Sequence, residues 1–284
     1  MIIIDGKKVA KEIYNGIKQE LLPFFEQKLQ PKIVVILVGD DPASLAYISA
    51  KRKKAEELGL KFEVLSLPAE MPQDEICRRV VDANRIAGIC GIVVQLPLPA
   101  KIEKQQVLDC VLPSLDVDGL GSANQTKLYA GGNAYMPPAP AAIMEIFKQY
   151  NIDLSGKHVL LIGAGDLIGK PLMRLLAQQS IPVSIVTEHT KDAAKLTKNA
   201  DVIITAVGKP KIVTGRMVKK NAVIIDAGTS FEIKSGKIKL VGDVDFESVK
   251  KKAAFVTPVP GGVGPVTVAM LYKNLLNSCK KILN

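Results

Sequence analysis

The segment "LSGKHVLLIGAGDLIGKPLMRLLAQQSIPVSIVTEHT" (residues 154–190) decides the fold of this chain. It contains an apolar strand at 157–162, a glycine-containing turn, a helix and a second apolar strand at 182–187. Gly163, Gly165 and Gly169 give the turn the spacing GxGxxxG. Glycines in such a turn let the backbone approach a pyrophosphate at the N-terminus of the following helix. The segment therefore predicts a dinucleotide-binding unit.

The glycine spacing alone is a weak motif, because glycines can also serve only to pack a helix closely onto a sheet. Its context strengthens the prediction. The segments "ADVIITAVGKP" (200–210) and "NAVIIDAG" (221–228) supply two further apolar strands at the spacing of a Rossmann-type sheet.

The first half of the chain alternates in the same way. Apolar runs indicate strands at 32–39, 61–67 and 89–97, and helix-periodic segments lie near 44–58 and 72–86. Continuous apolar strands separated by helices are typical of parallel sheets that are covered on both faces. The predicted fold class is therefore α/β throughout. Between about 113 and 141 the composition shifts to Gly, Pro, Asn and Ala, which marks the best candidate for a domain boundary.

The composition narrows the function classes. The four cysteines are widely spaced without a CxxC pair, and the chain has only two histidines, so we expect no metal site and no disulfide framework. The N-terminus lacks a signal-like apolar run, and no apolar run approaches 18 residues, so we expect no membrane segment and a cytoplasmic location.

The formal net charge of +10 allows three interpretations: a nucleic-acid partner, an anionic small ligand, or solvated lysine-rich faces. The basic residues are scattered, and aromatic residues make up only 5% of the chain. Because no aromatic stacking platform accompanies the charges, we expect no nucleic-acid partner.

Several further motifs occur in the order and spacing of one family. They are "YISAK" (47–51), "VVQLPLP" (93–99), "DVDG" (116–119), "GKP" (169–171), "AVGKP" (206–210), "GDVDF" (242–246) and "TPVPGGVGPVT" (257–267). Together they cover essentially the whole chain, and the "VQLPLP" and "TPVPGGVGP" segments are highly specific. The chain resembles the bifunctional methylenetetrahydrofolate dehydrogenase/cyclohydrolase family.

The resemblance implies an N-terminal α/β folate domain and a Rossmann domain that face each other across a cleft, usually in a homodimer. We expect residues 1–136 to form the first domain, completed by a C-terminal helix at 265–284, and residues 137–264 to form the second. The implied substrate is a tetrahydrofolate derivative, and the implied cofactor is NADP or NAD. The implied reactions are oxidation of 5,10-methylenetetrahydrofolate to the methenyl cation and hydrolysis of that cation to 10-formyltetrahydrofolate.

Tyr47 and Lys51 are four residues apart, so on a helix they share one face. A lysine on a helix is ordinarily solvated. A lysine in a cleft beside a cationic intermediate loses solvation and meets a like charge, and both effects lower its pKa toward the working pH. The resemblance implies that Lys51 is the catalytic base, with Gln95 hydrogen-bonded to its amine and Tyr47 stacked on the folate. The alternative for Gln95 is a polar residue that only ends a buried strand.

The resemblance also implies folate-binding residues. Asp118 would bind the donor edge of the pterin, and Pro260, Gly261, Gly262 and Val263 would form a wall beside it. The alternatives are a loop in which Asp116 and Asp118 make Asx-turns, and glycines that only form a turn.

Most of the expected cofactor-binding residues come after the carboxyl ends of the Rossmann strands, and one lies in the "TPVPGGVGPVT" segment. They are Gly163, Ala164, Gly165, Gly169, Glu188, His189, Val207, Gly208, Thr229 and Thr267. The family usually has Arg and Ser at the positions of Ala164 and Gly165 and prefers NADP. An acidic residue at the position of Glu188 typically binds the ribose 2′-hydroxyl of NAD. Since His189, Thr190 and Lys191 could instead meet a phosphate, the choice between NAD and NADP stays open.

The chain departs from the family pattern at Leu115, Gly121, Pro138, Ala139 and Ala142. These positions border the implied cleft and hinge, so two other functions stay open. One is a diverged dehydrogenase without efficient cyclohydrolase activity, and the other is a non-catalytic folate or nucleotide binder.

Overall fold

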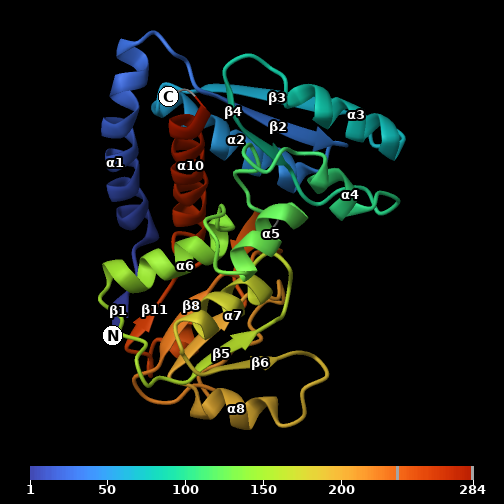
Figure 1. The fold of residues 1–284 in the computed structure, drawn as a ribbon. Helices are drawn as coiled ribbons and strands as arrows, with labels where there is room; N and C mark the ends of the chain where they lie inside the picture. Colours follow the sequence, from blue (N-terminus) through green and yellow to red (C-terminus); the bar gives the residue numbers. More distant parts are fainter. Residues whose placement is uncertain (235–236, 283–284) are drawn as a thin grey trace. The chain divides into compact units, whose positions relative to one another are not determined.

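The structure is a computed structural model that describes residues 1–234 and 237–282 (Figure 1). The chain forms two compact units. The first unit comprises Met1–Lys11 and Ala139–Ala269, and the second comprises Glu12–Pro138 and Met270–Asn284. Two helices, α1 (Gly6–Glu26) and α10 (Val263–Ile282), contain residues of both units.

A six-stranded sheet in the order β1–β11–β8–β7–β5–β6 forms the centre of the first unit, and all its strands are parallel. The strands are β1 (Ile2–Ile3), β5 (Val159–Ile162), β6 (Val183–Val186), β7 (Val202–Thr205), β8 (Val223–Asp226) and β11 (Phe255–Val256). Every residue of β5, β7 and β8 is buried, as continuous apolar strands require. The predicted Rossmann-type sheet is confirmed.

The strand order fixes where a ligand can bind in the first unit. From β5 the chain adds β6 on one side, and it then returns to add β7 on the other side of β5. The carboxyl ends of β5 and β7 therefore form a topological switch point, the place where open α/β sheets bind ligands. Gly163 and Ala206 follow these two strand ends directly.

Four helices and a hairpin complete the first unit. The helices are α6 (Pro138–Gln149), α7 (Gly169–Gln178), α8 (Ala193–Asn199) and α9 (Phe246–Val249), and the antiparallel hairpin consists of β9 (Ser230–Lys234) and β10 (Lys237–Val241). The core of this unit joins Leu160 and Ile162 of β5 with Ile203 of β7 and Ile224 of β8.

The second unit contains a three-stranded parallel sheet in the order β3–β2–β4. Its strands are β2 (Lys32–Val38), β3 (Lys61–Leu67) and β4 (Ile89–Val94), and its helices besides α1 and α10 are α2 (Pro42–Glu57), α3 (Gln73–Ala83), α4 (Lys104–Asp109) and α5 (Ser122–Tyr129). Ile36 of β2 lies in register with Val94 of β4, and both pack in one core with Ile76 and Val80 of α3.

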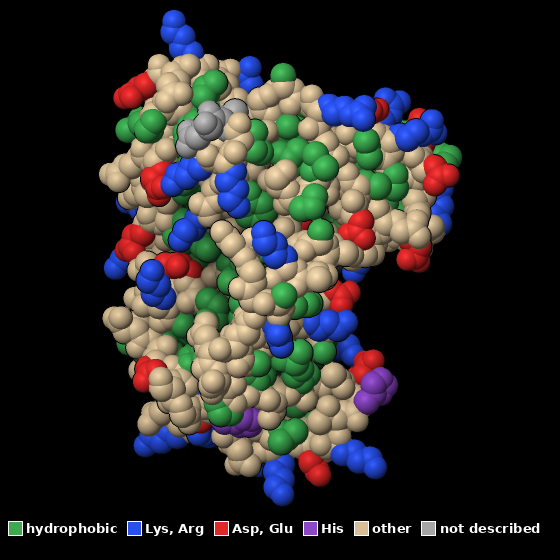
Figure 2. All heavy atoms as spheres, viewed as in Figure 1, with side chains coloured by type: hydrophobic (Ala, Val, Ile, Leu, Met, Phe, Trp, Pro, Cys, Tyr) green, Lys and Arg blue, Asp and Glu red, His purple; other side chains and the backbone are tan. Residues whose placement is uncertain are grey.

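The expected domain boundary at 136/137 assigns the first residues of the chain to the folate domain, whereas the structure places them with the Rossmann-type sheet. Ile2 and Ile3 pair with Phe255 and Val256 of β11, so Met1–Lys11 belongs to the first unit. Two residues of strand carry too little periodicity to be predicted from the sequence. Lys and Arg side chains are spread among acidic ones over the visible surface (Figure 2). Among the helices of residues 1–234 and 237–282, none is long and apolar enough to cross a membrane.

Candidate active site

Helix α2 carries Tyr47 and Lys51. The side chain of Asp41 accepts a hydrogen bond from the backbone N–H of Ser44 at 2.8 Å, and Pro42 occupies the first turn, so the helix start is defined. Tyr47 is 40% exposed, whereas Lys51, one turn further along the same face, is half-buried.

The side chain of Gln95 is a hydrogen-bond partner of the Lys51 amine. The Lys51 Nζ donates a hydrogen bond to Gln95 Oε1 at 3.0 Å. Gln95 follows the end of β4 and is buried, and its backbone N–H donates to the carbonyl of Ile36 on β2. Its side-chain Nε2 donates to the carbonyl of Leu96 at 2.7 Å. The amide oxygen is therefore held toward the lysine by two bonds, and Gln95 does more than end a buried strand.

Asp118 lies on a loop that runs beside β4. Asp116 bridges to Ile92 of that strand, and its buried carboxylate accepts hydrogen bonds from the backbone N–H groups of Leu120 and Gly121. These bonds reach four and five residues along the chain, so the Asp116 side chain braces the loop but does not make the Asx-turn of the alternative, which would bond the N–H two residues on. Asp118, two residues further, interacts electrostatically with Lys51.

The pKa values of Lys51 and Asp118 are both shifted. Burial lowers the pKa of the Lys51 amine, and the nearby charge of Asp118 opposes this shift. Burial raises the pKa of the Asp118 carboxyl against the opposing charge of Lys51, and with a smaller contribution from Asp116 the pKa is raised to about 6. Desolvation is the largest cause for both groups. Two ionisable groups with opposite shifts in one place are typical of an active site.

Helix α10 supports both sides of this site through polar side chains that the sequence analysis missed. The Tyr272 hydroxyl donates to the backbone carbonyl of Lys51 at 2.6 Å. The Asn274 amide donates to the carbonyls of Val117 and Met136 at 2.9 and 2.8 Å. One turn of helix therefore fixes the backbone beneath Lys51 and next to Asp118. The sequence showed only that both residues belong to the helix expected at 265–284, and not which groups they would bind.

The glycine turn of the first unit has the geometry of a phosphate cradle. Gly163 has φ +102°, in the left-handed region that favours glycine. A Cβ on Gly169 would lie 2.4 Å from the carbonyl oxygen of Gly163, so only glycine allows α7 to begin this close to β5. A Cβ on Gly165 would meet nothing within 4 Å, which leaves its surface accessible. The turn thus fits a pyrophosphate at a helix N-terminus.

Some of the other expected cofactor-binding residues lie near this turn. A Cβ on Gly163 would lie 3.1 Å from the Val207 side chain, and one on Gly208 would lie 3.7 Å from the carbonyl of Thr229. Glu188 follows the end of β6 and is exposed, and its carboxylate lies 3.5 Å from Lys209 Nζ. His189 Nε2 is 3.8 Å from the other oxygen of the same carboxylate. The sequence analysis did not assign Lys209.

Two buried carboxylates organise these loops, and the sequence analysis missed their part. Asp243 accepts hydrogen bonds from the Thr205 hydroxyl and from the backbone N–H groups of Val207 and Lys209, at 2.7–3.0 Å. Asp226 accepts from the N–H groups of Gly228, Asp243 and Val244. In the sequence, Asp243 lies in the "GDVDF" motif and Asp226 at the end of the apolar run in "NAVIIDAG", but neither position shows which groups the carboxylate binds.

The expected folate wall lies in the first unit, unlike Tyr47, Lys51, Gln95 and Asp118. Gly261 has φ +110°, and its carbonyl accepts the backbone N–H of Gly6 at 2.9 Å. Val263 begins α10, and its carbonyl accepts the hydroxyl of Thr267 at 3.1 Å. Pro260 is exposed.

The departures from the family pattern are accommodated locally. Leu115 is buried in the core of the second unit. A Cβ at Gly121 would lie 3.1 Å from the Asp116 carboxylate. Pro138, Ala139 and Ala142 all lie on α6. The four cysteines are free, and the described residues hold no group of three or more His, Cys, Asp or Glu side chains that could bind a metal ion.

The fold and these sites define a two-unit α/β protein with a Rossmann-type dinucleotide-binding unit. The family model for the tetrahydrofolate dehydrogenase/cyclohydrolase NAD(P)-binding domain matches residues 137–283, and the model for the catalytic domain of the same family matches residues 4–118. The chain belongs to the tetrahydrofolate dehydrogenase/cyclohydrolase family.

Relatives agree over the full length. The chain is 42% identical to a bifunctional protein FolD from Nautilia profundicola, covering 99% of this chain and 98% of the relative, and 44% identical to one from Hydrogenobaculum sp., covering 99% of each. The structure of the bifunctional FolD enzyme from Campylobacter jejuni matches with a TM-score of 0.94 at 38% identity, over 99% of both chains. The FolD structure from Trypanosoma brucei, in complex with NADP and an inhibitor, matches with a TM-score of 0.95 at 36% identity, over 100% of this chain and 99% of that one.

Proposed function

We propose that this protein oxidises 5,10-methylenetetrahydrofolate to 5,10-methenyltetrahydrofolate with NAD(P)⁺ and hydrolyses the product to 10-formyltetrahydrofolate. Membership of the family over the full chain supports both activities. The observation that carries the hydrolytic step is the bond between the Lys51 amine and Gln95, beside the carboxyl group of Asp118.

In the dehydrogenase step, the turn of Gly163, Gly165 and Gly169 would hold the pyrophosphate of the cofactor, with Val207 and Gly208 beside it. The cofactor, when bound, supplies the hydride acceptor. Asp118 would accept hydrogen bonds from the donor edge of the pterin, and Tyr47 would stack on its ring. Pro260, Gly261, Gly262 and Val263 would offer backbone to a flat ring.

In the cyclohydrolase step, the neutral amine of Lys51 would accept a proton from the attacking water. A C–O bond forms at the cationic bridging carbon. N5 then takes a proton, which Lys51 can return, and its bond to that carbon breaks as the hydroxyl proton is released to solvent and the C=O bond forms, which leaves the formyl group on N10. The lowered pKa of Lys51 makes the neutral amine available at lower pH than for a solvated lysine.

The test measures the two activities separately in one preparation. The joint appearance of methenyltetrahydrofolate and reduced cofactor, from 5,10-methylenetetrahydrofolate and NAD(P)⁺, reports the dehydrogenase. Decay of added methenyltetrahydrofolate above the uncatalysed rate reports the cyclohydrolase. Dehydrogenase activity alone would reduce the proposal to a diverged dehydrogenase. If neither activity is present, the protein is a binder and the proposal fails.

We further propose that, apart from the first residues of the chain, which pair with β11, residues 1–136 with 265–284 act as the folate domain and residues 137–264 as the cofactor domain. We also propose a homodimer, as the family resemblance implies, and a cytoplasmic location, which the four free cysteines support. Sedimentation in solution tests the dimer.

A further inference from the structure

The first unit contains a pocket that the proposed reactions do not use. Its volume is about 430 Å³, within the range of small-molecule sites. Six of its seven lining residues are basic: Lys198, Arg216, Lys219, Lys220, Lys251 and Lys252. We call these residues the basic pocket.

Three segments far apart in the sequence form the basic pocket, and hydrogen bonds hold two of them together. The backbone N–H of Asn221 donates to the carbonyl of Lys252 at 2.8 Å, and the N–H of Ala254 donates to the carbonyl of Ala222 at 2.8 Å. The Lys252 amine donates to the carbonyl of Val218 at 3.4 Å. The cations therefore converge on a preformed backbone framework.

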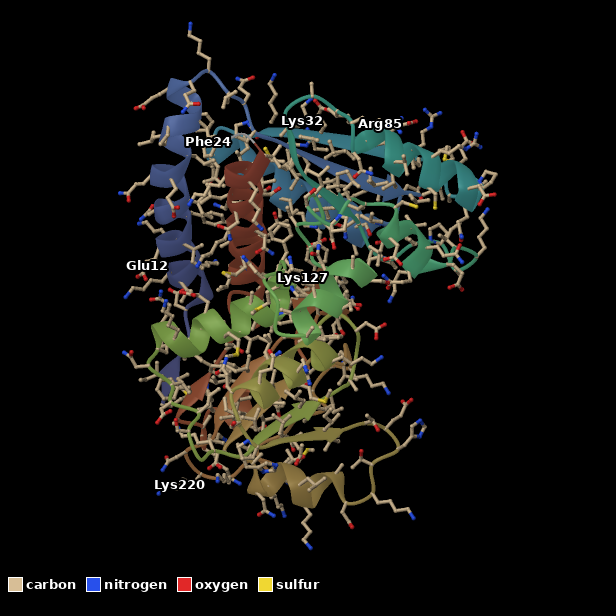
Figure 3. The ribbon with its side chains drawn as sticks, in the orientation of Figure 1. Glu12, Phe24, Lys32, Arg85, Lys127 and Lys220 are labelled. Atoms are coloured by element: carbon tan, nitrogen blue, oxygen red, sulfur yellow. The ribbon has the colours of Figure 1, made fainter. Side chains whose placement is uncertain are left out.

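The basic pocket lies at the opposite end of the sheet from the glycine turn. Its residues precede β8 and β11 or end the helix that leads into β7, so they sit where these parallel strands begin. Gly163 and Val207 follow the ends of β5 and β7. Figure 3 labels Lys220 on the side of the unit where the strands begin. A ligand in the basic pocket would therefore leave the cofactor turn accessible.

The charges of the basic pocket are poorly neutralised. Lys219 forms an ion pair with Asp201. In the described residues, no ion pair joins Arg216, Lys220 or Lys251 to an acidic side chain, whereas the neighbouring Lys250 pairs with Glu247. Like charges gathered in one concave surface repel one another and attract counter-ions. A ligand with several negative charges would relieve this repulsion.

We propose that the basic pocket binds a small polyanion that carries two or more phosphate groups. Lysine amines bind phosphate as point charges, and an arginine adds a bidentate donor. The lining contains no aromatic ring on which a nucleobase could stack, so the pocket would recognise the negative charge of the ligand and not its base. An inorganic oligophosphate and a nucleoside triphosphate should therefore bind with similar affinity.

Isothermal titration calorimetry of the full chain with sodium tripolyphosphate tests the proposal. At about 50 mM salt we expect tripolyphosphate to bind, with an affinity that falls steeply as salt rises and screens the charges. ATP should bind within about fivefold of tripolyphosphate. The Lys220→Gln/Lys251→Gln variant removes two exposed cations without a described ion pair, and its affinity should fall at least tenfold.

The matched control is Lys7→Gln/Lys11→Gln, which removes the same charge from exposed positions on α1 of the same unit. It should bind within twofold of the wild type. The proposal is overturned by an equal loss in both variants or by no binding at millimolar tripolyphosphate. Tighter binding of a single-stranded DNA oligonucleotide than of tripolyphosphate would also overturn it, in favour of a nucleic-acid surface. The outcome does not depend on the folate reactions.

Discussion

Gln95 offers the amine of Lys51 an uncharged acceptor at 3.0 Å. An amide oxygen orients the amine without adding a negative charge that would stabilise its protonated form. The burial that lowers the pKa of Lys51 is therefore opposed only by the more distant charge of Asp118. This arrangement suits a lysine that must lose its proton to act as a base.

Replacing Lys51 with methionine should abolish the cyclohydrolase step. General-base catalysis typically contributes about 10²- to 10⁴-fold, so we expect a loss of that size in the rate of methenyltetrahydrofolate hydrolysis. Lys53→Met is the matched control, because Lys53 is exposed on the same helix. Hydrolysis at the wild-type rate in Lys51→Met would mean that Lys51 is only a solvated lysine.

Replacing Gln95 with glutamate should move the pH dependence of hydrolysis. The new carboxylate would stabilise the charged amine and raise the pKa of Lys51. Because the base works when neutral, the rising limb of the pH–rate profile should shift to higher pH. Gln95→Leu provides no acceptor and no charge, so it should lower the rate without an alkaline shift. An unchanged profile in Gln95→Glu would argue that another group controls the limb.

The pKa of Asp118 predicts how folate binding depends on pH. Burial raises this pKa to about 6, so the carboxylate gains a proton as the pH falls through about 6. The protonated form loses acceptor capacity for the pterin donors. We expect the folate KM to rise below pH 6, while Asp118→Asn has a high KM at every pH. A wild-type KM that is constant from pH 5 to pH 8 would remove Asp118 from pterin recognition.

The sequence predicted the elements whose signal is local. The strands β2, β4, β5 and β7 are continuous apolar runs, and the spacing of the glycine turn predicts a cofactor site because it allows a close backbone approach. The fold class followed from these signals, the family followed from the ordered motifs, and both are confirmed. The roles of the individual site residues stay predictions.

What the sequence could not show depends on contacts between distant residues. Tyr272 and Lys51 are 221 positions apart, and the bond between them exists only after α10 packs against α2. The basic pocket likewise arises because strand pairing brings residues near 219 and 251 together, although each looks like an ordinary lysine pair. Periodicity carries no information about either arrangement.

Removing the Asp243 carboxylate should destabilise the loops at the carboxyl end of the Rossmann sheet. Asp243→Ala leaves the Thr205 hydroxyl and the N–H groups of Val207 and Lys209 without their acceptor, and we expect a loss of about 3 kcal/mol in the free energy of unfolding. Its KM for NAD(P) should rise more than its KM for folate. The control Asp245→Ala changes a half-buried aspartate whose side chain caps no helix N–H, so its cost should be about 0.5 kcal/mol or less. Equal costs in urea denaturation would contradict this account.

The ion pair of Glu188 and Lys209 should set the choice between NAD and NADP. The Glu188 carboxylate, just after β6, can accept a hydrogen bond from the ribose 2′-hydroxyl of NAD and repels a 2′-phosphate. Its ion pair with Lys209, at 3.5 Å, also neutralises the lysine charge that could otherwise attract that phosphate. We expect the wild type to use NAD at least comparably to NADP. Glu188→Ser removes the repulsion and releases Lys209 toward a phosphate, so kcat/KM should shift toward NADP. Glu247→Ser breaks the exposed pair with Lys250 and should leave the preference unchanged. A wild-type kcat/KM that favours NADP more than about a hundredfold, about 2.7 kcal/mol, would show that Glu188 does not contact the ribose.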